Sequence, residues 1–110
     1  MIQPDFLIRG TENINEVASY MKVNKVKYTF VIDGDKRPLG AITYANVLKA
    51  KEEGLLLADI IDKEILCENE ELYVNDVFEL AGTSKYPLVI IKDGKFRGIV
   101  TYETILASLV

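Results

Sequence analysis

Apolar residues along the chain recur with the spacing that is typical of one face of a helix, and they do so twice. The two sets follow i, i+3, i+4, i+7, and they are Ile14, Val17, Ala18 and Met21, then Val74, Val77, Phe78 and Ala81. After each set comes an apolar segment short enough to be a buried strand, at 28–32 and again at 87–91. The pattern predicts a helix followed by a strand, in two copies.

A polar turn follows each apolar strand. The turns Asp33-Gly34-Asp35 and Asp93-Gly94 are hairpin signals, and they lead into further strands at 39–43 and 97–101. A closing amphipathic helix is expected next, carried by Tyr44, Val47 and Leu48 in the first copy and by Tyr102, Ile105, Leu106 and Leu109 in the second. Gly54 is predicted to end the first closing helix.

With short strands at 6–9 and 65–67 before the first helices, each copy has the order β-α-β-β-α. The sequence itself repeats, because eight positions between 28 and 50 recur identically 58 residues later. These positions are Tyr28, Val31, Ile32, Asp35, Gly40, Thr43, Tyr44 and Leu48. We therefore predict an α+β fold of two repeats, 1–58 and 59–110. Since halves of this size bury too little surface alone, they should pack about a pseudo-twofold axis.

The composition of the chain excludes several classes of function. Thirteen basic and seventeen acidic residues give a net charge of −4, which argues against a nucleic-acid partner. No apolar run approaches the roughly 20 residues needed to cross a bilayer, and no signal peptide opens the chain, so a cytoplasmic location is expected. One cysteine, Cys67, and no histidine remove the common zinc sets and the Ser-His and Cys-His pairs. We expect no catalytic and no metal site.

Each strand-turn-strand segment ends in a Gly-x-x-Thr step, at 40–43 and at 98–101. In these segments, and over its whole length, the chain resembles a tandem pair of cystathionine-β-synthase (CBS) domains, the regulatory unit called a Bateman module. The stretches 30–34, 39–42 and 54–62 are similar to the C-terminal CBS pair of glycine betaine/proline-type ABC transporter ATPase subunits. The resemblance implies a non-catalytic regulatory module that forms a homodimer and meets a membrane only indirectly. The ATPase domain would lie in a parent chain, because no Gly-x-x-x-x-Gly-Lys-Ser/Thr run occurs here.

The resemblance also implies ligand binding in clefts between the repeats. Thr43 and Thr101 stand where a helix start offers unpaired N–H groups to phosphate oxygens. Family members that bind adenine nucleotides have an Asp three residues later for the ribose hydroxyls, whereas this chain has Asn46 and Thr104. Neither carries the charge that strengthens such bonds, which weakens the case for AMP or ATP. The alternative role of both threonines is helix capping without any ligand.

Aromatic residues suggest a second class of ligand. Tyr28 and Tyr86 are expected either to stack on an adenine or to fill the core between repeats. Within the transporter branch, the resemblance implies that some members bind cyclic di-AMP between two modules, chiefly through the second repeat. The corresponding patch here would be Tyr86, Ile99, Thr101 and Tyr102. No cofactor is required by either reading, and AMP, ATP and cyclic di-AMP stay open as ligands.

Charge is distributed unequally. Residues 1–58 carry eight basic and seven acidic residues, and residues 59–110 carry five and ten. Lys22, Lys25 and Lys27 cluster near the end of the first helix, where they either lie in solvent or sense ionic strength at an anionic membrane, as the transporter branch implies. The acidic stretch 59–79 either lies in solvent or meets this basic cluster on a partner module. The rival function is a ligand-free dimerisation module of another transporter or enzyme.

Overall fold

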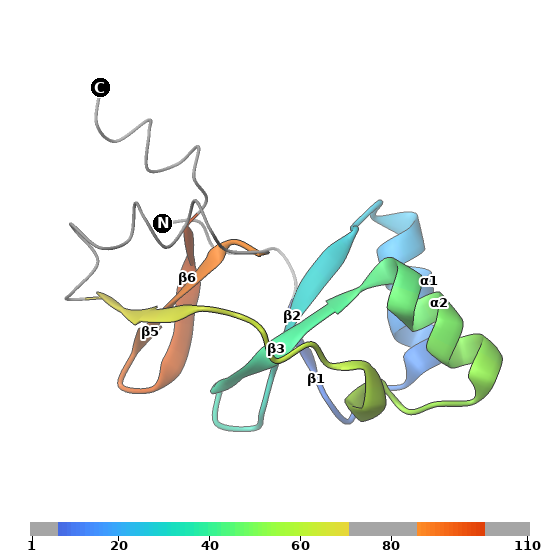
Figure 1. Cartoon of the computed structure of the whole chain (residues 1–110), viewed down its shortest axis with the longest axis horizontal. Helices are drawn as coiled ribbons and strands as arrows, with labels where there is room; N and C mark the ends of the chain where they lie inside the picture. Colours follow the sequence, from blue (N-terminus) through green and yellow to red (C-terminus); the bar gives the residue numbers. More distant parts are fainter. Residues whose placement is uncertain (1–6, 71–85, 101–110) are drawn as a thin grey trace. The chain divides into compact units, whose positions relative to one another are not determined.

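The computed structural model describes residues 7–70 and 86–100. These residues belong to two compact units, one of which is Phe6–Lys63, while the other contains Glu64–Val110. The elements of the first unit are β1 (Leu7–Arg9), α1 (Ile14–Val23), β2 (Tyr28–Ile32), β3 (Pro38–Thr43), α2 (Tyr44–Glu53) and the 3-10 helix η1 (Leu57–Ile60). Those of the second are β4 (Cys67–Asn69), β5 (Leu88–Lys92) and β6 (Lys95–Val100). Figure 1 shows both sets.

The first unit holds a three-stranded sheet in the order β1-β2-β3. Strand β1 pairs with β2 in parallel, whereas β2 and β3 form an antiparallel hairpin with Tyr28 opposite Thr43 and Val31 opposite Gly40. The predicted β-α-β-β-α order is therefore confirmed for the first repeat. The second sheet has the matching order β4-β5-β6 and the same parallel and antiparallel pairings. Its predicted first strand lies two residues later than expected, at Cys67–Asn69.

Helix α1 forms where the apolar spacing predicted it. The side chain of Asn13 caps its start by accepting hydrogen bonds from the backbone N–H groups of Asn15, at 2.8 Å, and of Glu16, at 3.4 Å. Helix α2 ends at Gly54, whose φ of 71° lies in the left-handed region that glycine adopts without strain. Both the first helix and the predicted glycine stop are confirmed.

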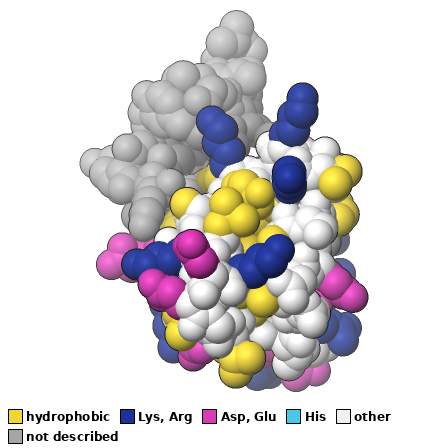
Figure 2. Space-filling view, turned by 90° about the vertical axis from the view of Figure 1, so that its right-hand side faces the viewer, with side chains coloured by type: hydrophobic (Ala, Val, Ile, Leu, Met, Phe, Trp, Pro, Cys, Tyr) yellow, Lys and Arg dark blue, Asp and Glu magenta, His cyan; other side chains and the backbone are white. Residues whose placement is uncertain are grey.

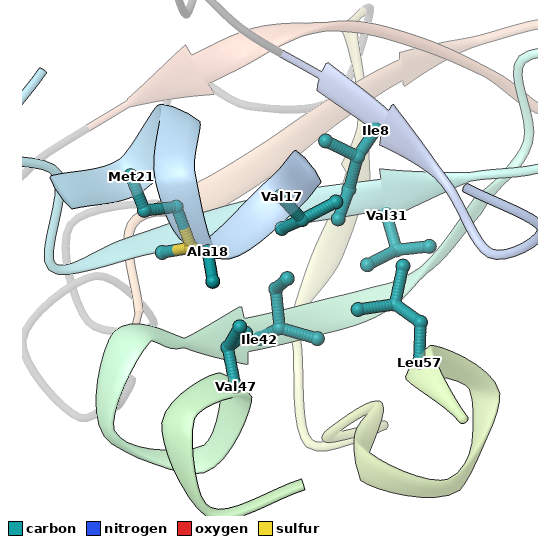
Figure 3. Close-up of a cluster of buried hydrophobic side chains, with 8 residues drawn as sticks. All are labelled: Ile8, Val17, Ala18, Met21, Val31, Ile42, Val47 and Leu57. Carbon is teal, nitrogen blue, oxygen red and sulfur yellow. The ribbon is translucent and has the colours of Figure 1, made fainter. Parts of the chain in front are cut away.

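One hydrophobic cluster holds the first unit together. Figure 3 shows side chains from β1, α1, β2, β3, α2 and η1 converging on a common centre, namely Ile8, Val17, Ala18, Met21, Val31, Ile42, Val47 and Leu57. Because η1 contributes Leu57, the segment after the closing helix is part of this core. The chain beyond η1 is also tied to the sheet, since Ala41 and Asp62 exchange two backbone hydrogen bonds of 2.9 and 2.8 Å.

The two hairpins differ in length by one residue, and this corrects the alignment of the repeats. In β2 and β3 Val31 pairs with Gly40, but in β5 and β6 it is Ile90 that pairs with Gly98. The strand β5 is thus offset from β2 by 59 residues, whereas β6 is offset from β3 by 58. The predicted equivalence of Tyr28 and Tyr86 is therefore wrong: Tyr28 opens β2, and Tyr86 lies one position earlier than its counterpart would. Neighbouring residues of an extended chain face opposite ways, so the two tyrosines have different environments.

Candidate functional site

The junction of β3 and α2 is the best-defined part of the predicted site. Thr43 is the last residue of β3, and its Oγ1 accepts a hydrogen bond of 3.2 Å from the backbone N–H of Asn46. Its extended backbone, with φ −103° and ψ 152°, is that of a helix N-cap. The capping role that the sequence left open for Thr43 is therefore present. Its partner in the second repeat, Thr101, lies outside the described residues, as do Tyr102 and Thr104.

Replacing Thr43 with alanine is expected to lower the free energy of unfolding by about 1 kcal/mol, because α2 loses the acceptor for an N–H of its first turn. Urea-induced unfolding followed by circular dichroism measures this change. Thr43→Ser keeps the hydroxyl group and should stay close to the wild-type value. Equal losses in both variants would contradict a capping role, because they would place the effect in the methyl group.

The structure brings three predicted residues of the first repeat together. Tyr28 lies opposite Thr43 in the ladder, and Thr43 bonds to the backbone of Asn46. The ring of Tyr28 is half-buried and meets Phe30 edge to face, with centroids 6.0 Å apart and planes at 84°. Asn46 is exposed, so its amide is the uncharged group that would have to replace the family's ribose-binding Asp.

The second unit places the remaining described candidates differently. Tyr86 is only 6% exposed and precedes β5, and Ile99 is a buried residue of β6 paired with Val89. Both belong to one compact unit, and both side chains are more buried than that of Tyr28. Their part in ligand binding stays a prediction.

A groove of about 400 Å³ adjoins the β3–α2 junction, and the sequence pattern did not reveal it. Its lining combines the apolar residues Met21, Val26, Tyr44 and Ala45 with Thr43 and the lysines Lys22, Lys25 and Lys27. We call this feature the basic groove. The backbone N–H of Tyr44 donates a 2.8 Å hydrogen bond to the carbonyl of Lys27, which fixes the loop after α1 beside the start of α2. The only sequence signal was the lysine cluster, which indicates charge but not a concave surface.

Cys67 is the single cysteine of the chain. The residue is exposed at the start of β4 and forms no disulfide. Partial desolvation around the sulfur raises the pKa of the Cys67 thiol, which lowers its thiolate fraction at neutral pH. The environment is therefore not that of a reactive cysteine.

The hairpin turn between β2 and β3 contains Asp33, a second residue whose pKa differs from its usual value. Backbone N–H groups of Arg37 and Asp35 donate to the Asp33 carboxylate, at 2.9 and 2.8 Å. These hydrogen bonds hold the pKa of Asp33 below its usual value, and the bond from Arg37 has the largest effect. The carboxylate closes the turn through these two hydrogen bonds.

Within residues 7–70 and 86–100, no helix is long and apolar enough to span a membrane.

Comparisons with known proteins agree with this architecture. The CBS domain family matches residues 1–53 and 57–110. The glycine betaine transport ATP-binding protein OpuAA of Bacillus subtilis is 26% identical over 90 residues, which are 81% of this chain and 22% of that protein. The chain thus spans about a fifth of the length of the curated relatives that it matches.

Solved structures share the fold at low sequence identity. Staphylococcus aureus OpuCA has a TM-score of 0.86 at 17% identity, covering 99% of this chain and 94% of that one. CbpB in complex with c-di-AMP has a TM-score of 0.79 at 22% identity, covering 94% of this chain and 75% of that one. Together with the family match over both repeats, these similarities lead to one conclusion: the chain belongs to the CBS domain family, as a tandem CBS pair of α+β fold and a regulatory module.

Proposed function

We propose that this CBS pair is the regulatory part of an ABC transporter ATP-binding subunit that serves glycine betaine or a similar osmolyte. The observation that carries the proposal is the similarity to OpuAA, which extends over 81% of this chain. The share of OpuAA that the chain covers, 22%, leaves room for an ATPase domain in a parent polypeptide. The module itself would work as a homodimer.

We further propose that the regulatory ligand is cyclic di-AMP. Support comes from the first repeat, where an exposed neutral Asn46 stands in place of the carboxylate that ordinary adenine nucleotides would use. It also comes from CbpB, whose structure with c-di-AMP shares this fold. The contacts are assigned to the second repeat, through Tyr86, Ile99, Thr101 and Tyr102.

The mechanism in this proposal is a population shift. A ligand that binds one arrangement of the module more tightly than another favours that arrangement by its difference in binding free energy, and the attached ATPase responds. The protein would need no catalytic group of its own.

The test is titration calorimetry of the purified chain with cyclic di-AMP, AMP and ATP, supported by thermal unfolding. A ligand at 100 times its Kd adds about 2.7 kcal/mol of stability. Each kcal/mol raises the melting temperature of a small domain by roughly 4–8 °C, so binding of cyclic di-AMP should raise it by at least about 10 °C. Saturable heat with cyclic di-AMP and none with AMP or ATP is the expected result.

The repeat supplies a matched pair of variants for the same titration. Thr101→Ala should abolish the heat of cyclic di-AMP binding, whereas Thr43→Ala, in the other repeat, should lower stability and leave binding unchanged. Absence of heat with cyclic di-AMP would contradict the proposed ligand. Absence of heat with all three nucleotides would support the second candidate, a ligand-free dimerisation module, which the missing ribose carboxylates favour.

A further inference from the structure

The basic groove has the size and the lining of a small-molecule site. Its volume of about 400 Å³ lies in the range of ligand pockets, which are largely apolar and contain a few polar groups. The apolar part is fixed, because Met21 is 1% exposed in the core cluster and both Val26 and Tyr44 pack against that cluster. The 2.8 Å hydrogen bond from the N–H of Tyr44 to the carbonyl of Lys27 joins the walls. The folded first repeat therefore forms the groove by itself.

The positive charge of the groove is not paired within the part of the chain that the structure describes. Lys22, Lys25 and Lys27 are exposed, and none of them forms an ion pair with another residue of 7–70 or 86–100. Figure 2 shows the face that carries α1 and α2, where Lys and Arg side chains border hydrophobic ones. A ligand that suits this surface carries negative charge on an apolar body.

Lys25 has a backbone conformation that favours glycine. Its φ is 55°, in the left-handed region, and it directly follows Asn24, the C-cap of α1. The N–H of Val26 donates to the carbonyl of Met21 at 2.9 Å. The N–H of Lys25 donates to the carbonyl of Lys22 at 3.3 Å, which completes a Schellman motif. Glycine usually occupies this position of the motif, because a Cβ is strained in the left-handed region.

The strain at Lys25 points to a use for its side chain. Residues in sparsely populated backbone conformations gather at functional sites, where the side chain contributes something other than stability. Two other described residues, Lys36 and Asp93, share the conformation, but both lie in hairpin turns, which commonly require such a residue. Lys25 instead lines the groove and has no ion-pair partner among the described residues. Its contribution is a positive charge at the groove.

We propose that the basic groove binds a small organic anion in which an acidic head group is attached to an apolar body. The ammonium groups of the three lysines bind the head group, and the apolar lining contacts the body. A nucleotide fits less well, because the described residues that line the groove include no carboxylate or amide side chain for ribose hydroxyls and base edges. This inference goes beyond the proposed function, whose ligand contacts are assigned to the second repeat, and does not depend on it.

Fluorescence titration of the full chain with 8-anilinonaphthalene-1-sulfonate tests the site, because this dye is an anion with an apolar body. Saturable binding to the folded protein is expected, and decanoate should displace the dye. Inorganic phosphate has negative charge without the apolar body, and decyltrimethylammonium has an apolar chain with the opposite charge. Neither of these two compounds should displace the dye.

Lys25→Gly separates a role in binding from a role in the fold. Removal of the strained Cβ is expected to raise the melting temperature by about 4 °C. Loss of one ammonium group should raise the Kd of the dye by about threefold. Lys36→Gly is the matched control, because Lys36 is also exposed with a φ of 66° but does not line the groove. It should stabilise the protein in the same way and leave dye binding unchanged.

Two further variants change the charge of the groove more strongly. The triple variant Lys22→Gln, Lys25→Gln, Lys27→Gln should raise the Kd of the dye by about tenfold or more. Ala45→Asp adds a carboxylate at an exposed residue of the groove and should also weaken dye binding. Since Ala45 is the second residue of α2 and an acidic residue suits a helix start, this variant should stay folded. Circular dichroism verifies the fold of each variant.

Several results would overturn the proposal. These are the absence of saturable dye binding, an unchanged dye Kd in Lys25→Gly and in the triple variant, and displacement by inorganic phosphate as effective as that by decanoate. Displacement by AMP or cyclic di-AMP at lower concentrations than by decanoate would assign the groove to a nucleotide instead. Titration of the same samples with cyclic di-AMP keeps the two proposals apart, because failure to bind it contradicts the proposed function and leaves the dye results as they stand.

Discussion

Gly40→Ala is expected to reduce the stability of the first repeat by roughly 3 kcal/mol. A Cβ at this position would run into the carbonyl oxygen of Asp62 and the side chain of Ile61. The chain that follows η1 would have to move away from β3, which would break the two hydrogen bonds between Ala41 and Asp62. The effect comes from close backbone approach, since Gly40 has no positive φ.

Thermal unfolding of Gly40→Ala measures this effect, and a fall in melting temperature of about 10 °C or more is expected. Gly34→Ala is the matched control, because a Cβ at Gly34 meets no atom within 4 Å and its φ is not positive. The control should melt within a few degrees of the wild type. If both variants behave alike, the approach of Asp62 to β3 does not contribute to stability.

Leu57→Ala is expected to cost between about 2 and 5 kcal/mol, the usual range for a buried leucine truncated to alanine. Leu57 is 2% exposed and lies in the core cluster with Ile42 and Val47, as Figure 3 shows. Removal of its isobutyl group leaves a cavity among residues held by the sheet and by both helices, which limits how far the site can collapse.

The neighbouring residue provides the control for this variant. Leu56 is 70% exposed, and Leu56→Ala should change the free energy of unfolding by less than about 0.5 kcal/mol. Urea denaturation of both variants gives the comparison. Similar losses for Leu56→Ala and Leu57→Ala would show that η1 contributes through its helical backbone rather than through the buried side chain.

The sequence predicted the fold of the described repeat well, because local patterns and the internal repeat agree. The spacing of Val17, Ala18 and Met21 located α1, and Gly54 marked the end of α2. The strand predictions were right in order, with ends that differ by one or two residues from those in the structure. Pairing geometry sets such ends, and side-chain periodicity does not record it. The packing of the two repeats about a pseudo-twofold axis stays a prediction.

The alignment of the tyrosines failed for a physical reason. A turn tolerates an extra residue because that residue lies outside the hydrogen-bonded ladder, so the two hairpins changed length while their strands kept the same pairing. Sequence identity at a fixed offset of 58 residues then matched Tyr28 with Tyr86, although the strand pairing places the two tyrosines at different positions. Only the ladder partners of each strand reveal the shift.

The sequence predicted the β3–α2 junction of the candidate site but not the basic groove beside it. Gly-x-x-Thr placed Thr43 at the start of a helix, and the cap is present. The basic groove escaped prediction because it combines residues from α1, the following loop and α2, which are near one another only in the folded repeat. The sequence pattern shows the lysines as charge and Met21 and Tyr44 as parts of two apolar helix faces. Tertiary packing alone joins the two.

The pairing of Asp62 with Ala41 shows that the packed unit is longer than the stretch of sequence that repeats. The identities between the repeats end at Leu48 in the closing helix, yet the packed structure of the first unit continues through η1 to the strand-like contact at Asp62. A copy excised after Glu53 would keep every recognisable feature of the repeat, but β3 would become an open sheet edge and the Leu57 site a void. The stretch of sequence that repeats is therefore shorter than the stretch of chain that a stable first unit requires.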